Sequence, residues 1–264
     1  MPRLKLTLEY DGTRYVGWQV QLNGVSIQAR VQESLARLLG EPVRVEVAGR
    51  TDAGVHATGQ VVCFDTERSL PLKAYVKGLN GFLPEDIAVV RAEEVPPDFD
   101  PRHWSHGKRY HYRVSNRPTR SPLRRFTHWE VFASLDVEAM RRAATALVGR
   151  HDYSAFRASD CQAAHAVREV RRLEVRGAAG DEVSFMVEGT AFLKHMVRNL
   201  VGTLVEVGKG RQPEAWVAEV LACGDRKRAG PTAPAQGLVL EQVFYGEGPP
   251  PRTPGGTADV YDEG

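Results

Sequence analysis

The chain has 264 residues, and its 42% of hydrophobic residues is enough to bury one large core or two modest ones. No run of about 18 apolar residues is present, and the N-terminus is a charged, alternating stretch unlike the apolar segment of a signal peptide. These features argue against a membrane-spanning helical protein and predict a folded protein located in the cytoplasm.

The 35 basic and 33 acidic residues give a formal net charge of only +2, but they are unevenly distributed. Arginines are concentrated at residues 109–125, 141–150 and 168–176, and acids at residues 85–100 and in the tail. This asymmetry allows a basic face that holds phosphates. On composition alone, a solvated arginine-rich surface is the simpler explanation.

The first half of the chain is predicted to follow the order β-α-β-β-α-β. Alternation of apolar and polar residues predicts its strands, and apolar residues at helical spacing predict its helices. In chain order these are a strand at 4–10, a helix at 26–39 capped by Ser26 and ended by Gly40, strands at 43–48 and 60–65, a helix from Pro71, and a strand at 87–92. This order is typical of a ferredoxin-like unit, with helices over one face of a mainly antiparallel sheet.

A similar series of elements begins near Arg109. It comprises the strand KRYHYRV at 108–114, a helix capped by Asp136 and closed by Gly149, strands at 167–175 and 182–187, helices at 192–207 and 213–221, and a last strand at 238–244. We therefore expect an α+β fold of two tandem ferredoxin-like halves, at residues 1–103 and 104–247. Residues 248–264 have too few apolar side chains to pack and are expected to form a flexible tail.

The segment AGRTDAGVHATGQV at residues 48–61 is the strongest candidate for a functional site. It places glycines, Arg50 and Asp52 in a loop between two apolar strands. The glycine spacing matches neither a dinucleotide-binding nor a phosphate-binding loop. Asp52 could instead stabilise a turn by hydrogen-bonding to nearby main-chain groups, and Arg50 could likewise have a purely structural role.

Five segments that occur in order across residues 9–245 together resemble the TruA family of tRNA pseudouridine synthases. They are EYDGTRYVGWQ, AGRTDAGVHATGQV, KRYHYRV, FLKHMVRNLVGTLVEVGKG and GLVLEQVFY. The resemblance implies an isomerase that converts uridine to pseudouridine at positions 38, 39 and 40 of the tRNA anticodon arm. It also implies that the enzyme needs no cofactor and forms a homodimer.

The same resemblance implies roles for particular residues. Asp52 corresponds to the essential aspartate, Tyr110 to the active-site tyrosine and Arg198 to the arginine that pairs with the aspartate. Arg50 corresponds to the arginine that helps to extrude the target nucleotide, and Leu238 to an apolar residue packed beside the base.

Pseudouridine formation explains why these residue types are needed. The bond between C1′ and N1 breaks, the base turns, and C5 joins the same C1′ without any outside atom. A carboxylate could attack C1′ or C6 of the ring, or remove a sugar proton to give a glycal. Each route starts from an ionised Asp52, although a flipped base excludes water and desolvation raises a carboxyl pKa. The guanidinium of Arg198 could hold the carboxylate charged and oriented.

The residue pattern by itself leaves simpler alternatives for the other candidates. On a helical wheel of residues 192–205, Arg198 and His195 lie toward or on the polar side, which favours a surface arginine and a surface histidine. In KRYHYRV, Tyr110 and Tyr112 share one face of the strand, so only the resemblance separates them. Packing explains most tyrosines in strands.

Neither a metal site nor a disulfide framework is predicted. Cys63, Cys161 and Cys223 are far apart, and no further ligands complete a tetrahedral site with His103 and His106. Two rival functions remain at this stage. A non-catalytic RNA-binding protein of the same fold would be expected to lack the Asp52 carboxylate, and a glycosidase-like enzyme would release free uracil.

Overall fold

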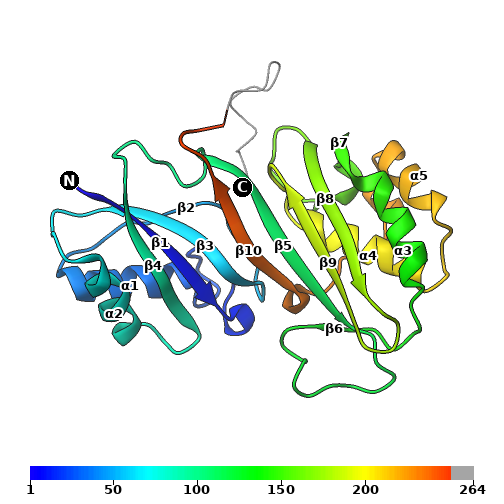
Figure 1. Cartoon of the computed structure of the whole chain (residues 1–264), viewed down its shortest axis with the longest axis horizontal. Helices are drawn as coiled ribbons and strands as arrows, with labels where there is room; N and C mark the ends of the chain where they lie inside the picture. The colour runs from blue at the N-terminus through cyan, green and yellow to red at the C-terminus, as the bar shows by residue number, and fades with distance from the viewer. Residues whose placement is uncertain (251–264) are drawn as a thin grey trace. The chain divides into compact units, whose positions relative to one another are not determined.

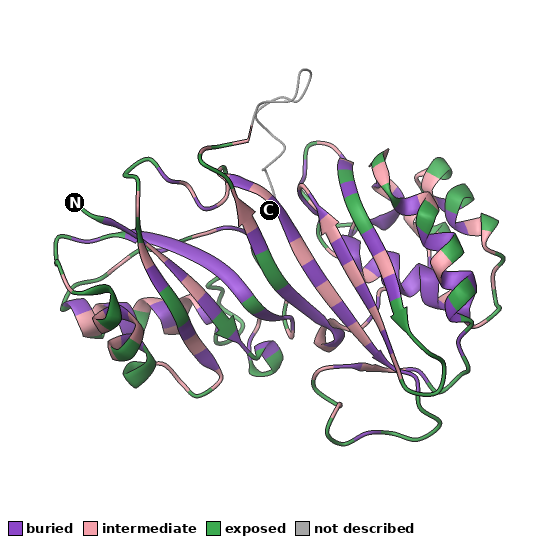
Figure 2. Ribbon diagram, in the orientation of Figure 1, coloured by how far each residue is buried: buried purple, intermediate pink, exposed green. Residues whose placement is uncertain are grey.

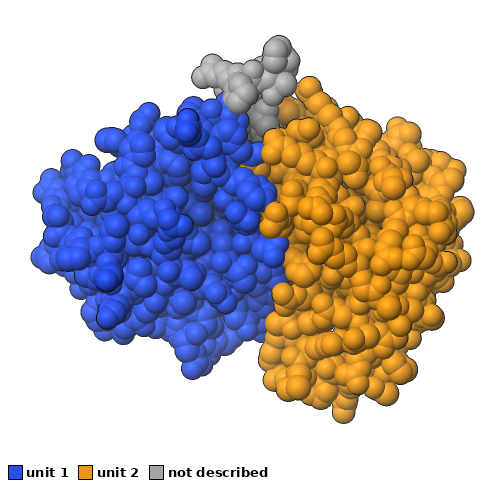
Figure 3. Space-filling view, viewed as in Figure 1, with its two compact units in different colours: residues 1–106, 239–250 blue, residues 107–238, 251–264 orange. Residues whose placement is uncertain are grey.

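The computed structural model describes residues 1–250, which divide into two compact units (Figure 3). The first unit contains residues 1–106 and 239–250, and the second contains residues 107–238. The last strand, β10 (Leu238–Tyr245), therefore groups mainly with the first unit, although the sequence predicts it for the second half. The division into halves at 1–103 and 104–247 stays a prediction, and residues 251–264 of the predicted tail lie outside the described residues.

The sheet of the first unit has the strand order of a ferredoxin-like fold. Its own strands are β1 (Arg3–Tyr10), β2 (Glu46–Val47), β3 (His56–Asp65) and β4 (Ile87–Val95). The antiparallel pairs β1–β3, β1–β4 and β2–β3 give the order β4-β1-β3-β2, as the sequence predicts (Figure 1). β10 pairs in parallel with the start of β3, which explains why it groups with this unit.

The helices of the first unit are α1 (Ile27–Leu39) and α2 (Leu72–Phe82), and they pack against each other. The side chain of Ser26 accepts a hydrogen bond from the Ala29 N–H at 3.2 Å, and α1 ends at Gly40 with φ at 76°. Both predicted ends of this helix are thus confirmed. The buried apolar residues of α1 are Ile27, Val31, Leu35 and Leu39.

The second unit contains an antiparallel sheet in the order β5-β9-β8-β7. Its strands are β5 (Ser105–Ser115), which enters from the first unit, β7 (Gly149–Asp152), β8 (Val167–Gly177) and β9 (Glu182–Gly189), and the short β6 (Trp129–Glu130) pairs in parallel with β5. Buried and half-buried residues alternate along β9 (Figure 2). The sequence does not predict β6 and β7 because they are too short to show alternation.

The helices of the second unit are α3 (Val137–Ala144), α4 (Met196–Gly208) and α5 (Ala215–Cys223). The Asp136 carboxylate caps α3 by accepting from the Ala139 N–H at 2.9 Å. α3 ends well before Gly149, however, and continues as a 3-10 turn. The 3-10 helices of the described chain are Gly12–Arg14, Thr145–Leu147, Ser154–Phe156, Arg226–Arg228 and Ala235–Gly237.

The predicted start of α4 is wrong, and the helix is buried on more sides than its helical wheel indicates. The sequence predicts a helix from residue 192, but His195 has φ at 62° and the helix begins only at Met196. A left-handed residue cannot continue a right-handed helix. The sequence also predicts a polar side for this helix, yet all residues of α4 except Arg198 and Glu206 are buried. α4 is therefore a core helix, and its polar residues need partners inside the unit.

Candidate active site

The first and second sequence motifs contact each other and fix the backbone of the loop that carries Asp52. The hydroxyls of Tyr10 and Thr51 lie 2.8 Å apart, and Gln60 Nε2 donates to the Gly49 carbonyl at 2.8 Å and to the Tyr10 hydroxyl at 3.3 Å. The main-chain N–H of Trp18 donates to the Thr51 carbonyl at 3.0 Å. Burial raises the pKa of Tyr10 to about 12, so its hydroxyl keeps its proton at neutral pH.

Two glycines of the first motif allow this close approach. A Cβ atom on Gly12 would lie 2.0 Å from the Val55 carbonyl oxygen. Gly17 has φ at 105° and forms a β-bridge with Asp52, and a Cβ atom there would lie 2.7 Å from the Thr51 carbonyl oxygen. Neither position has room for a side chain, so EYDGTRYVGWQ serves as a support for the Asp52 loop.

Asp52 is half-buried, whereas Arg50 is exposed. The turn at Asp52 is closed by main-chain atoms, because its carbonyl oxygen accepts from the Val55 N–H at 3.1 Å. The β-bridge with Gly17 holds the same residue from the other side. The turn is therefore supported by main-chain contacts on both sides of Asp52.

His56 lies at the junction of the two motifs, and the sequence pattern did not single it out. It is only 6% exposed, and its Nδ1 lies 3.1 Å from both the Gly12 nitrogen and Asp11 Oδ1. Burial would raise the pKa of Asp11, but hydrogen bonds from Thr13 and the nearby His56 hold it below its usual value. The sequence signal that could have identified His56 is its position within the segment GRTDAGVH.

The two tyrosines of β5 have different neighbours in the second unit. Tyr110 and Tyr112 share one face of the strand, as the alternation predicts, and both are buried, at 8% and 0% exposure. The Tyr112 hydroxyl donates to the Pro234 carbonyl at 2.7 Å, and burial raises its pKa. The Tyr110 ring meets Phe192 edge-on, with 5.2 Å between the ring centroids. Tyr112 is therefore tied to the segment at Pro234, and the choice of Tyr110 as the active-site tyrosine still rests on the resemblance.

Arg198 is not the solvated surface arginine that periodicity favours. It is half-buried in the first turn of α4, and its Nε donates to the Ala233 carbonyl at 2.7 Å. Leu238, at the start of β10, is 6% exposed. Among the site candidates, Asp52 and Arg50 belong to the first unit, and Tyr110, Arg198 and Leu238 belong to the second.

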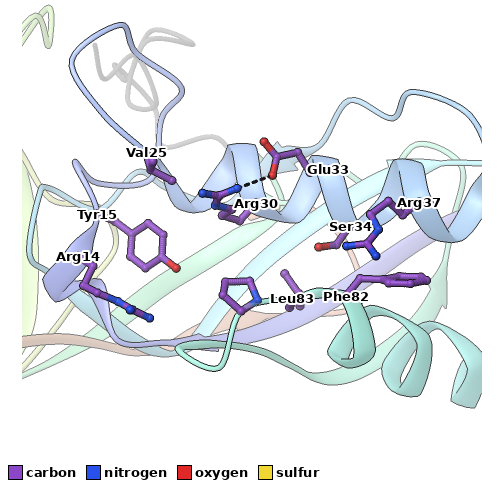
Figure 4. Close-up of a pocket in the computed structure, with 10 residues that line it drawn as sticks. Arg14, Tyr15, Val25, Arg30, Glu33, Ser34, Arg37, Phe82 and Leu83 are labelled. Atoms are coloured by element: carbon purple, nitrogen blue, oxygen red, sulfur yellow. Dashed lines mark hydrogen bonds and ion pairs between the residues drawn. The ribbon is translucent and has the colours of Figure 1, made fainter.

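The first unit also contains a pocket of about 460 Å³ between α1 and the C-terminal end of α2 (Figure 4). Three arginines line it, but each already has a partner within the unit. Arg30 pairs with Glu33 at 2.9 Å and Arg14 with Asp86 at 2.6 Å, while the guanidinium carbon of Arg37 lies 4.3 Å from the centre of an aromatic ring of α2. Each arginine that lines the pocket thus contacts an acidic or aromatic side chain of the same unit.

The described part of the chain contains neither a helix long and apolar enough to cross a membrane nor a cluster of three or more metal-ligating side chains. Its three cysteines are free thiols.

Comparison with known proteins identifies the group to which the chain belongs. A family model described as tRNA pseudouridine synthase matches residues 7–103 and 143–246. The chain belongs to this family. It is 75% identical over 263 residues to tRNA pseudouridine synthase A of Myxococcus xanthus, with 100% of this chain and 99% of the relative covered. The matched ranges include Arg50, Asp52, Arg198 and Leu238, while Tyr110 lies between them.

Other members of the family are also similar over their full lengths. The enzymes named tRNA pseudouridine synthase A in Pelobacter propionicus and Geobacter sulfurreducens are 51% and 50% identical over 245 residues, with 93% of this chain and 100% of each relative covered. A chain in a crystal structure of a Cbf5–Nop10–Gar1 complex is similar over 90% of this chain and 48% of that chain, at 11% identity and a TM-score of 0.40, which is too distant to bear on function.

Membership of the tRNA pseudouridine synthase family confirms the resemblance seen in the five sequence segments. The α+β fold class predicted from the sequence is confirmed as well. The chain is thus an enzyme, an isomerase that forms pseudouridine in tRNA.

Proposed function

We propose that this tRNA pseudouridine synthase modifies positions 38, 39 and 40 of the anticodon arm, with Asp52 acting on a uridine flipped out of the RNA. The observation that carries the proposal is the support of the Asp52 loop. Asp52 is half-buried, and the main chain of its loop is held by contacts with the buried residues Tyr10, Trp18 and Gln60. Such a fixed support suits a group that must meet a reacting atom in one geometry.

The other candidates have complementary roles in the same proposal. Arg198 keeps the Asp52 carboxylate ionised when the base excludes water, because a guanidinium remains charged at any physiological pH. Tyr110 stacks on the flipped base, and Leu238 packs beside it. Arg50 is exposed beside Asp52 in the sequence and helps to extrude the nucleotide. The enzyme works in the cytoplasm without a cofactor, and as a homodimer, which light scattering of the purified protein would test.

The decisive experiment is the substitution Asp52→Asn, which keeps the shape of the side chain and removes its negative charge. Binding of tRNA should persist, because phosphate contacts supply most of the affinity. Turnover should fall to background, because an amide neither attacks carbon nor accepts a proton. Release of tritium from C5-labelled uridine in tRNA measures the reaction, since C5 loses its hydrogen when it bonds to C1′, and filter binding measures affinity on the same preparation.

Tritium release by Asp52→Asn at the rate of the unaltered enzyme would overturn the role of Asp52. Free uracil among the products of the unaltered enzyme would favour the base-releasing rival. Tritium release without uracil by the unaltered enzyme, together with normal binding and no release by Asp52→Asn, would exclude the RNA-binding-only rival. Transcripts with a single labelled uridine at 38, 39 or 40 test the positions separately.

A further inference from the structure

A loop of the second unit, residues 225–234, lies directly against the backbone of α4. A Cβ atom on Gly202 would lie 1.7 Å from the Pro231 carbonyl oxygen, and one on Gly230 would lie 2.6 Å from the Thr203 Cα atom. The Gly230 N–H also donates to Thr203 Oγ1 at 3.0 Å. Helix and loop thus meet through their main chains, and glycines make this possible.

The same loop holds Arg198 at two points through one residue, Ala233. The Ala233 N–H donates to the Arg198 carbonyl at 3.1 Å, and Arg198 Nε donates to the Ala233 carbonyl at 2.7 Å. A displacement of Ala233 would therefore move one acceptor of the guanidinium and also change the contact with the helix backbone. The loop thus contributes to the direction of the Arg198 side chain.

Arg226 ties the loop to α4. One terminal nitrogen of its guanidinium donates to the Gly230 carbonyl at 2.9 Å, and the other donates to Asn199 Oδ1 and Thr232 Oγ1, both at 3.0 Å. The Thr232 hydroxyl also donates to Asn199 Oδ1 at 2.6 Å. Asn199 is fully buried beside Arg198 in the sequence, and its amide nitrogen donates to the Phe156 carbonyl at 2.7 Å.

All three of these acceptors of Arg226 are uncharged, so none of the three hydrogen bonds is to a carboxylate. The guanidinium is partly buried, and burial lowers the pKa of Arg226. Burying a charge in this way costs free energy unless its geometry is well satisfied. A planar fork with several donors can reach acceptors on two segments at once, whereas lysine is a point charge. This arrangement suits a residue that fixes the position of the loop on α4.

We infer that Arg226, with Asn199 and Thr232, is a positioning residue that orients Arg198 for pseudouridine formation. The inference rests on the role proposed for Arg198 and extends it to residues with no assigned function. Loss of the Arg226 fork loosens the loop and moves the Ala233 carbonyl, which shifts one hydrogen-bond acceptor of the Arg198 guanidinium. Reaction on bound RNA then slows while RNA binding is little changed, because a small misplacement of a reacting group costs rate more than affinity.

The test compares Arg226→Met with Arg228→Met, which removes an exposed cation from the same 3-10 helix. Single-turnover tritium release at saturating enzyme should slow by about 10- to 100-fold in Arg226→Met and stay within about twofold of the unaltered enzyme in Arg228→Met. The dissociation constant for tRNA should change by less than about threefold in both. Thr232→Val, which keeps shape and removes one hydroxyl of the network, should slow the reaction by a smaller factor and decides the question if Arg226→Met does not fold.

A double-mutant cycle with Arg198→Lys separates positioning from general structural damage. If Arg226 acts through Arg198, adding Arg226→Met or Thr232→Val to Arg198→Lys should slow the reaction little further. Rate losses that multiply would overturn the inference, as would unchanged single-turnover rates in the single variants or an Arg198→Lys enzyme of unaltered rate. Asp52→Asn is measured in parallel as a test of the proposed function itself. If the proposed role of Asp52 is wrong, turnover persists in Asp52→Asn, and this result is distinct from the rates of the Arg226 and Thr232 variants.

Discussion

The loop around Asp52 shows how single residues determine whether a reactive side chain is well placed. Its backbone is fixed by contacts with residues about 40 positions earlier in the chain, among them the pair Tyr10 and Thr51 and the approach of Gly12 to Val55. None of these supporting residues needs to touch RNA. Substitutions among them should therefore affect turnover through the loop.

At Gly12 we expect alanine to be strongly disruptive. The added methyl group would lie 2.0 Å from the Val55 carbonyl oxygen, so the Asp52 loop must move. We expect a loss of about 1–3 kcal/mol in the free energy of unfolding, the usual range for overpacking, together with a large loss of tritium release. Urea unfolding and the tritium assay measure the two effects.

Gly81→Ala is the matched control for Gly12→Ala. Gly81 lies in α2, and an added methyl group there would meet no atom within 4 Å other than those of its chain neighbours and its own helix backbone, so alanine should stabilise the helix by about 0.5–1 kcal/mol. Its turnover should equal that of the unaltered enzyme. Equal stability and turnover for Gly12→Ala and Gly81→Ala would contradict the role of Gly12 as a support for the loop.

At the scale of the element, α3 offers a test of local capping. Asp136→Ala removes the acceptor of the Ala139 N–H and should lower the free energy of unfolding by about 1 kcal/mol. Asp136→Asn should remain close to the unaltered protein, since asparagine caps helices comparably. Thermal or urea unfolding provides the measurement, and an equal loss in both variants would show that charge matters here more than capping.

The C-terminal end of α4 carries a pH-dependent ion cluster. Burial would raise the pKa of Glu206, but hydrogen bonds from Lys209 at 2.9 Å and Arg211 at 3.1 Å outweigh it and hold the pKa below its usual value. A carboxyl with a lowered folded-state pKa stabilises the protein above its unfolded pKa, and this contribution is lost as pH falls through the folded pKa.

Glu206→Gln should therefore be less stable than the unaltered protein at pH 7, and the gap should narrow as the pH falls below the ordinary range of a glutamate. Urea unfolding at several pH values measures the gap. Glu219→Gln removes an exposed carboxylate 3.8 Å from Arg228 and should show little difference at any pH. A gap for Glu206→Gln that stays constant down to acid pH would rule out the proposed ion cluster.

At the scale of the whole molecule, the arginine-rich stretches are less basic than the sequence suggests. Arg142 pairs with Glu214 at 2.7 Å and Arg124 with Asp181 at 3.1 Å, partners that lie 72 and 57 positions away. Arg176 pairs with nearby Glu174. Counting arginines along the chain therefore overestimates the charge available to phosphates, because folding brings acids beside many of them.

Binding of tRNA should nevertheless weaken steeply with salt, since phosphate contacts release counterions. Arg50→Gln should reduce the slope of log affinity against log salt by roughly 0.7–0.9, the value for one phosphate contact. Arg142→Gln should leave the slope unchanged, because Glu214 already neutralises that cation. Filter binding across a salt series measures both slopes. An affinity for tRNA that does not vary with salt would contradict binding through phosphates.

The sequence by itself determined the features that depend on near neighbours. Ser26, Gly40 and Asp136 mark helix ends because a cap acts over three or four residues. Alternation in β5 predicted that Tyr110 and Tyr112 share one face of the strand, and five short segments together predicted the family. Each of these signals lies within a short stretch of chain.

Only the tertiary structure decided the features that depend on distant contacts. It gave Tyr112 a hydrogen-bond acceptor 122 positions away in Pro234, and Arg198 an acceptor 35 positions away in Ala233. It also grouped β10 with the first unit. Periodicity describes which way a side chain points from its own element, whereas burial and hydrogen bonding depend on the segments that pack against that element.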